Sequence, residues 1–447
     1  MSKLVHAQWS SRMAFILAAT GSAVGLGNIW RFSYLVGDSG GAAFVLIYLA
    51  CVALVGLPVL VSEWLIGRRG QKNPIHAMAE LATKSGQPKA WALVGASGVL
   101  AAFLILSFYS IIGGWSLSYT LGSVTGRFSG QDIDGIGAIF GNLLGSPGIL
   151  TLWHTAFMAL VIWIVARGVT KGLEGAVRTM MPALVLLLLI LVGYGMTTGH
   201  FGEAMAFMFR PDWSAVTGGV VLAAMGQAFF TLSLGMGIMM AYGSYLGEEV
   251  SLLGTARTVI VLDTIIALLA GMAIFPIVFA NGMSPSEGPG LIFVNLPVAF
   301  GNIAGGTLLG LMFFLLLTFA ALTSAISLLE PTVELVEERT PLSRVGATII
   351  SGVAVWVLGI AALLSFNIWD DVLFFGLNIF DLLDTFTSKV MLPLTGLGAI
   401  IFVAWCLERN SVTQELGLTG GKEQLWNLVA RYVAPIGLIA VFLAGLF

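Results

Sequence analysis

The sequence predicts an all-α polytopic membrane protein with eleven transmembrane helices, and two observations carry that prediction. Hydrophobic residues make up 58% of the chain and charged residues only 10%, which is far from the composition of a soluble globular domain. Apolar runs recur along the chain, each close to the roughly 20 helical residues that a bilayer core requires. The short alternating segments typical of a transmembrane β-barrel are not seen.

Charges, glycines and prolines divide the apolar runs into eleven expected helices. These helices cover residues 12–35, 41–67, 90–124, 149–166, 173–196, 215–245, 253–280, 307–337, 343–366, 372–408 and 425–446. The segment 282–306 contains three prolines and is too broken to span, so we expect a re-entrant or capping loop there. The first run lacks an A-x-A cleavage pattern and reads as a retained helix, not a signal peptide. Residues 1–447 therefore form one predicted membrane domain.

The positions of lysine and arginine predict the orientation. With the N-terminus in the cytoplasm, only Arg127 and Arg210 fall at outer loops, and a large set falls at cytoplasmic helix ends, where positive charge accumulates. That set is Lys3, Arg12, Arg68, Arg69, Lys72, Lys84, Lys89, Arg167, Lys171, Arg178, Arg257, Arg339, Arg344, Arg409, Lys422 and Arg431. An odd number of helices then places the C-terminus outside.

Several classes of function find no support in the sequence. A net charge of −3 is too small to indicate a nucleic-acid partner. Cys51 and Cys406 lie inside apolar runs and read as small hydrophobic residues. His76, His154 and His200 have no metal-site spacing and read as solvated or interfacial. No G-x-x-x-x-G-K-[ST] motif predicts a nucleotide, and no nucleophile and base suggest an enzyme.

Two expected helices carry dense glycine at membrane depth. Residues 21–28 read GSAVGLGN and residues 231–237 read TLSLGMG. Glycine costs about 1 kcal/mol in a helix interior relative to alanine, and unwound backbone within a membrane is tolerated only where it lines a polar site or is buried in protein. The breaks lie five helices apart, which predicts inverted repeats at 12–196 and 215–408, with 425–446 outside both. The alternative is that these glycines allow close helix packing.

A broken helix provides the groups that an amino acid and a cation need. Free N–H groups favour a carboxylate, and free C=O groups favour a cation. Asn28, Thr231, Thr323 and Ser324 supply oxygen atoms of the kind that a hard cation such as sodium prefers. Asp263 is a lone carboxylate deep in an apolar run, and because burying it unpaired is costly, we expect a cation or gate role in preference to a structural hydrogen bond.

At these residues the chain resembles the neurotransmitter:sodium symporter family, and it is most similar to its bacterial eleven-helix hydrophobic amino-acid transporters. The resemblance runs from Trp9 to about Phe442. Its motifs are Trp9–Arg12, Gly21–Phe32, Gly40–Phe44, Glu63–Trp64, Gly226–Gly235 and Leu322–Ser324. It implies a sodium-coupled symporter of a bacterial-type inner (plasma) membrane that imports aliphatic and aromatic L-amino acids by alternating access. A channel or a non-transporting sensor of the same architecture is the alternative.

The resemblance also implies sites for two sodium ions and a substrate pocket. The first ion would be held by Asn28, Thr231, Asp263, the Ala23 carbonyl and the substrate carboxylate. The second would be held by Gly21, Val24, Ala320, Thr323 and Ser324. The substrate pocket would comprise Leu26, Gly27, Ile105, Tyr109, Phe230, Thr231, Ser233, Met236, Ser324 and Leu328. Where Asp263 stands the family commonly has asparagine, and many animal members need chloride, so we expect chloride-independent transport here. Met236 adds an adaptable thioether that tolerates several substrate shapes.

The resemblance implies gates at both ends of the pathway. Arg31 would face Asp384 at the outer end, with Tyr109 and Phe230 as a lid beneath; a surface ion pair is the alternative. At the cytoplasmic end, His6 stands at the usual arginine position with Lys3 nearby. A latch from His6 toward Glu338 would be pH-sensitive.

Two further features each have two interpretations, and a third, an intramembrane lysine, has no identified partner. Gly172 and Pro182 match the family's Gly-x9-Pro motif, whose unwinding is thought to open a water path to the second sodium; an ordinary loop glycine with a proline kink is the alternative. Gly113 and Gly114 either leave room beside Tyr109 or serve packing. Lys389 lies within the 372–408 run and needs a partner or a route to the membrane surface, and the sequence identifies no partner.

Overall fold

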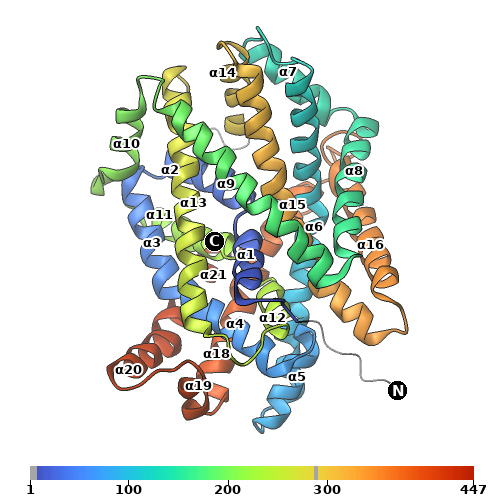
Figure 1. Cartoon of the computed structure of the whole chain (residues 1–447), viewed down its shortest axis with the longest axis vertical. Coiled ribbons are helices and arrows are strands. Elements are labelled where there is room, and N and C mark those ends of the chain that lie inside the picture. Colours follow the sequence, from blue (N-terminus) through green and yellow to red (C-terminus); the bar gives the residue numbers. More distant parts are fainter. Residues whose placement is uncertain (1–7, 286–289, 447) are drawn as a thin grey trace.

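The computed structural model describes residues 8–285 and 290–446, which are almost entirely helical (Figure 1). Its α-helices are α1 (Arg12–Ala23), α2 (Phe32–Asp38), α3 (Ala42–Cys51), α4 (Leu57–Gly70), α5 (Pro74–Lys84), α6 (Ala92–Val124), α7 (Ile133–Leu144), α8 (Pro147–Val165), α9 (Gly175–Gly195), α10 (Phe201–Phe209), α11 (Gly218–Thr231), α12 (Ile238–Ser244), α13 (Leu252–Ala280), α14 (Leu296–Gly301), α15 (Gly306–Arg339), α16 (Arg344–Leu364), α17 (Ile379–Phe386), α18 (Leu392–Ile401), α19 (Arg409–Glu415), α20 (Gly421–Leu428) and α21 (Ala434–Leu446). In this part of the chain, the one β-type pairing is the isolated bridge between Phe374 and Leu377.

The predicted transmembrane runs are all helical. Among the described residues, nine helices are long and apolar enough to cross a membrane, and the bent pair Arg12–Ala23 with Gly27–Asp38 makes ten. The interrupted pair α11 and α12 occupies the remaining predicted run, 215–245. One boundary was wrong: the run 372–408 becomes helical only at Ile379. Positive φ angles at Phe375 (54°) and Gly376 (80°) keep the preceding residues in turns.

Several helical segments contain π-helical turns, which are wider than α-helical ones. These turns are η1 (Gly27–Arg31), η2 (Val52–Gly56), η4 (Val169–Glu174), η6 (Leu291–Asn295), η7 (Thr387–Met391), η8 (Phe402–Cys406) and η9 (Val429–Val433). Because π-helical turns in α-helices are frequent at functional sites, their positions are relevant to the site below.

Both predicted helix breaks are present. The first span bends by 54° between Ala23 and Gly27, where Val24 has an extended backbone (ψ 96°). The second breaks between Thr231 and Ile238, where Ser233 and Gly235 have φ angles of 53° and 76°. A Cβ atom at Gly235 would also collide with the carbonyl oxygen of Leu392, so this position requires glycine.

The segment that was predicted as a capping loop does not span. In its described part, η6 and α14 form a short helix that lies with α7 at one end of the bundle, while α5, α19 and α20 lie at the other (Figure 1). We call these the α14 end and the α5 end. Gly130 N donates to Gly301 O at 2.9 Å, and Asn302 Nδ2 donates to Gln131 O at 2.9 Å. These bonds fasten the capping segment to the loop that follows α6.

Candidate functional site

The two breaks meet in the centre of the bundle. Ser233 on the second break donates to the Ser22 carbonyl at 2.9 Å, and Ser324 on α15 donates to the same carbonyl at 3.0 Å. Gln227 Nε2 on α11 donates to Gly27 O at 2.8 Å. Buried backbone carbonyls around the first break are therefore bonded by side chains from α11, the second break and α15, as buried polar backbone must be.

Asp263 on α13 forms a buried cluster with Asn28 and Thr231. Asn28 Nδ2 donates to Asp263 Oδ1 at 2.8 Å, and Thr231 Oγ1 donates to Oδ2 at 3.1 Å. Tyr48 OH donates to Oδ2 at 3.4 Å; the sequence reasoning missed this residue, because a tyrosine in an apolar run carries no signal of its own. All four side chains are at most 1% exposed. No basic side chain in residues 8–285 or 290–446 forms an ion pair with Asp263 within 4.0 Å, so no side chain there balances a charge on this buried carboxylate.

The residues predicted for the second ion gather where α1 meets α15. Thr323 Oγ1 donates to Ala320 O at 3.0 Å and lies 3.4 Å from Val24 O. Ser324, the next residue on α15, donates to the first break. Gly21 lies one helical turn before Val24 on α1 and packs against Val177 and Met181 of α9. Val24, Ala320 and Thr323 therefore present oxygen atoms to one another.

Beside these clusters lies a small central cavity of about 20 Å³. Eight residues predicted for the substrate line it: Gly27, Ile105, Tyr109, Phe230, Ser233, Met236, Ser324 and Leu328. Ser22, Ala23 and Gly25 also line it, although they were not predicted as substrate residues. A Cβ atom at Gly25 would collide with Ser324 Oγ, so only glycine fits this close approach.

Two of the predicted substrate residues do not line the central cavity. Leu26 donates its backbone N–H to Tyr109 OH at 3.3 Å and lines the next cavity instead. Thr231 is absent from the lining, because its hydroxyl is turned toward Asp263.

A larger cavity of about 220 Å³ lies on the other side of Phe230 and Tyr109. This Trp30 cavity is lined by Leu26, Gly27, Trp30, Arg31, Tyr34, Phe108, Tyr109, Ile112, Phe230, Phe380 and Asp384. Arg31 stacks over the Phe230 ring with its guanidinium carbon 4.6 Å from the centroid. The two predicted gate charges, Arg31 and Asp384, face this one cavity, yet among the described residues no ion pair within 4.0 Å joins them. Arg31 contacts the predicted lid in place of the predicted carboxylate.

The α5 end is closed by contacts between distant segments. Trp9 donates its indole N–H to Tyr242 O at 3.1 Å and its backbone N–H to Tyr245 O at 3.2 Å. Ser10 hydrogen-bonds through both its backbone and its hydroxyl to Glu174. Trp9 and Ser10 are thereby held on η4 and on the end of α12.

Two carboxylates on α15 reinforce this closure. Glu330 is fully buried and pairs with Arg344, whose Nη1 donates to it at 2.9 Å. Glu338 is bound by Asn73 N at 2.7 Å and contacts His76 Nδ1 at 3.0 Å. His76 was interpreted as solvated or interfacial; its side chain is 36% exposed, in agreement with that reading, and it also contacts the predicted latch carboxylate. His6 and Lys3 lie outside the described residues.

The structure corrects or narrows three other interpretations. His154 was expected at a membrane surface but is fully buried, with Nε2 3.2 Å from Trp356 O and Nδ1 3.2 Å from Ser110 Oγ. Gly113 and Gly114 pack directly against α8, which is the packing alternative. In the Gly-x9-Pro segment, Gly172 lies in the π-helical turn η4 and Pro182 inside α9, so this segment is helical here.

Glu63 is a site residue to which sequence reasoning gave no role. It lies on α4, is fully buried, and its Oε1 accepts the Gly235 N–H at 2.7 Å. Its Oε2 has no hydrogen-bond partner among the described residues. This carboxylate therefore holds the second break through the Gly235 N–H.

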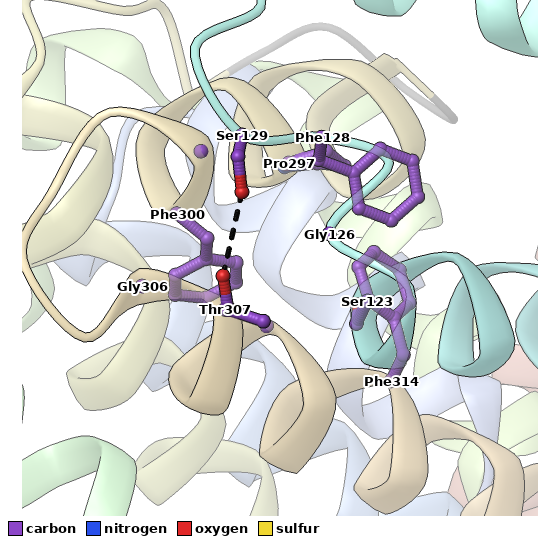
Figure 2. A pocket seen from close by; sticks show the side chains of 11 residues that line it. Ser123, Gly126, Phe128, Ser129, Pro297, Phe300, Gly306, Thr307 and Phe314 are labelled. Atoms are coloured by element: carbon purple, nitrogen blue, oxygen red, sulfur yellow. Dashed lines mark hydrogen bonds between the residues drawn. The ribbon is translucent and has the colours of Figure 1, made fainter.

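A separate small hollow of about 10 Å³ lies at the α14 end. Figure 2 shows Ser129 and Thr307 facing each other across it, 3.4 Å apart, with Phe128 and Phe314 alongside. The buried Ser123 Oγ at its wall has no hydrogen-bond partner among the described residues. This volume is about that of one water molecule, which makes the hollow part of the packing of the capping segment and not a ligand site.

Comparison with known proteins places this geometry among transporters. The model of the sodium:neurotransmitter symporter family matches residues 6–134 and 138–447. The uncharacterized sodium-dependent transporter YhdH of Bacillus subtilis (strain 168) is 39% identical over 447 residues, which cover 99% of this chain and 98% of that protein. An uncharacterized sodium-dependent transporter of Haemophilus influenzae is 34% identical and covers 98% of each chain.

The chain is also similar to a solved structure. The crystal structure of MhsT in complex with L-phenylalanine has a TM-score of 0.91 and 47% sequence identity, and the match covers 98% of this chain and 99% of that one. The predicted fold class, a polytopic helical membrane protein with two discontinuous helices and a 5+5 repeat, is confirmed.

Proposed function

Since this chain belongs to the sodium:neurotransmitter symporter family, we propose that it imports hydrophobic L-amino acids, both aliphatic and aromatic, together with sodium. It is a sodium-dependent multi-pass membrane transporter and not an enzyme. The observation that carries the finer proposal is the buried cluster of Asn28, Thr231 and Asp263 beside the apolar central cavity. Such a cluster offers a carboxylate and neutral oxygen atoms to a cation, and the cavity beside it has mostly apolar side-chain walls.

The lining of the central cavity supports an apolar substrate. Its side-chain walls are Ile105, Phe230, Met236 and Leu328, and its polar groups belong to the two breaks and α15. MhsT, with L-phenylalanine bound in its crystal structure, is 47% identical, which supports an aromatic substrate for this chain as well. A volume of about 20 Å³ holds little more than one water molecule. Side chains must therefore move before an amino acid enters, and the flexible Met236 and the lid residue Phe230 are suited to do so.

We assign one sodium to Asn28, Thr231, Asp263 and the Ala23 carbonyl, and a second to the Gly21, Val24 and Ala320 carbonyls with Thr323 and Ser324. Oxygen ligands of this kind suit a hard cation. The first site contains its own negative charge at Asp263, which supports transport without chloride. The second contains no carboxylate, so its ion is held by neutral oxygens.

Sodium and substrate are linked through Asn28. Its Oδ1 accepts the Gly25 N–H at 3.2 Å, while its Nδ2 binds Asp263. A sodium ion that takes Oδ1 as a ligand competes for this oxygen and releases the Gly25 N–H, and Gly25 lines the central cavity. The released donor is then available to a substrate carboxylate.

Alternating access follows from the two ends of the bundle. The α5 end, which we assign to the cytoplasm together with the N-terminus, is closed by Trp9 and Ser10. We assign the α14 end to the outside together with the C-terminus, and we assign the Trp30 cavity, with the gate charges Arg31 and Asp384, to the outer part of the pathway. We assign the repeats to residues 12–196 and 215–408, in a bacterial-type inner membrane.

Uptake into proteoliposomes tests this function. We expect labelled L-phenylalanine and L-leucine to accumulate above the outside concentration under an inward sodium gradient, and not when potassium replaces sodium. A thermal-shift screen of twenty amino acids with and without sodium gives the substrate range. Uptake that only follows the substrate gradient would identify a channel, and sodium-dependent binding without uptake would identify a sensor.

A further inference from the structure

A third cavity, of about 400 Å³, lies behind the stacked Arg31 and Phe230, between α11, η7 and α21. We call it the Lys389 cavity. Its wall is mostly apolar, and its three charged side chains are Arg31, Asp384 and Lys389. It shares Arg31, Phe230 and Asp384 with the Trp30 cavity. The two gate residues therefore line the same cavity as Lys389, the intramembrane cation to which the sequence assigns no partner.

The π-helical turn η7 contributes to the position of Lys389 on the wall of the same cavity as Asp384. In a regular α-helix, a residue five positions later points roughly 140° away. Leu392 N, however, donates to Thr387 O, a bond that spans five residues; because a π-helical turn has more residues per turn, the chain rotates less per residue over this segment, which turns Lys389 partway back toward the face of Asp384. The last helix accommodates this lysine through Gly445, where a Cβ atom would lie 3.0 Å from Lys389 Cβ.

The three charges are near one another but not paired. Among the described residues, none of Arg31, Asp384 and Lys389 has an ion pair within 4.0 Å, and Arg31 lies over Phe230. Asp384 experiences electrostatic attraction from Arg31 and from Lys389, and repulsion from Asp381. One carboxylate thus has two cations beside it on the wall of the Lys389 cavity.

We propose that Lys389 is a positioning residue of the outer gate, which competes with Arg31 for Asp384 and so holds the gate open. This inference rests on the proposed function, in which the Arg31–Asp384 pair closes the path above the substrate. A competitor that binds Asp384 only in the open gate shifts the equilibrium toward opening by its differential affinity. For a partly solvated ion pair, we expect the ratio of open to closed gate to change by about two- to fivefold.

Alkylation of a reporter cysteine measures the open population. The parent carries Cys51→Ala, Cys406→Ala and Ala223→Cys, since Ala223 is half-buried on the wall of the Lys389 cavity. N-ethylmaleimide is uncharged, so its local concentration does not change when a charge is removed. In sodium without amino acid, Lys389→Gln should slow alkylation about two- to fivefold, and Lys389→Arg should restore the parent rate.

Asp384 provides the decisive control. In a parent with Asp384→Asn, Lys389→Gln should change the alkylation rate by less than about 1.5-fold, because the carboxylate for which the cations compete is gone. A purely structural role for Lys389 predicts the same slowing in both parents. The proposal is overturned if Lys389→Gln leaves the rate unchanged or raises it, or if the slowing persists without Asp384.

A second measurement separates this proposal from the proposed function. Addition of L-phenylalanine with sodium should protect Ala223→Cys in the parent. If L-phenylalanine does not protect the cysteine, the assignment of the outer gate is wrong, and the proposal for Lys389 is refuted with it. If it protects and Lys389→Gln has no effect, only the proposal for Lys389 is refuted. Should Lys389→Gln fold poorly, Lys389→Met serves in its place, with folding checked by thermal unfolding.

Discussion

Replacement of Asp263 by asparagine tests the central electrostatic idea. The carboxylate accepts hydrogen bonds from Asn28 at 2.8 Å and from Thr231 at 3.1 Å, so an ion bound by these oxygens lies within about 4 Å of it. At an effective dielectric constant of about 20, two unit charges at this distance attract by about 4 kcal/mol. Desolvation offsets part of that attraction. Because 1.4 kcal/mol corresponds to tenfold, Asp263→Asn should raise the half-saturating sodium concentration by roughly 10- to 1000-fold.

Sodium titration of uptake in proteoliposomes measures this shift, with chloride or gluconate as the anion. Wild-type uptake should be the same in both anions, and Asp263→Asn should work better in chloride, because an external anion then supplies the missing charge. Asp371→Asn, which changes an exposed carboxylate outside the cluster, is the matched control. The reasoning is refuted if wild-type uptake collapses in gluconate, or if the variant keeps its sodium dependence within twofold.

Three further substitutions test other parts of the structure. Asn28→Ala should weaken sodium and substrate binding together, each by about tenfold or more, as measured by ligand binding at low and high sodium; intact substrate affinity at low sodium would contradict the coupling. Gly113→Ala should destabilise the protein by about 1–3 kcal/mol through overpacking against Phe157 without altering substrate selectivity; a changed selectivity would contradict the packing role. Glu330→Gln should lower thermal stability, since removing one partner of a buried ion pair costs about 3–5 kcal/mol; an unchanged unfolding temperature would contradict it.

The helices and their breaks were predictable because each depends on residues that are close together in the sequence. A run of about 20 apolar residues can satisfy its backbone in lipid only as a helix, and the dense glycines at 21–27 and 235–237 mark where that helix is costly. The start of the tenth span was predicted too early because that prediction, too, relied on local apolar composition. Residues 372–378 are apolar enough for a helix, but positive φ angles at Phe375 and Gly376 place them in turns, and composition alone does not reveal this.

Partners from distant segments were not predictable. Asp263 was identified by its type and depth, whereas Tyr48, which completes its cluster, looks like any other residue of an apolar run. The burial of His154 between Ser110 and Trp356 and the pairing of Glu330 with Arg344 depend on which helices pack together. A single sequence shows which buried polar groups need a partner, but which residue becomes that partner depends on tertiary packing.

The position of Asn28 gives a physical reason for coupling in one binding step. The amide lies between a carboxylate that needs a cation and a backbone N–H that lines the central cavity. Asn28 Oδ1 accepts the Gly25 N–H. In the proposed mechanism, a sodium ion that takes Oδ1 as a ligand releases this N–H, which then donates to the substrate carboxylate. By linkage, the factor by which sodium tightens substrate binding must equal the factor by which substrate tightens sodium binding. Two independent titrations of the wild type must therefore agree, and Asn28→Ala should reduce both factors toward one.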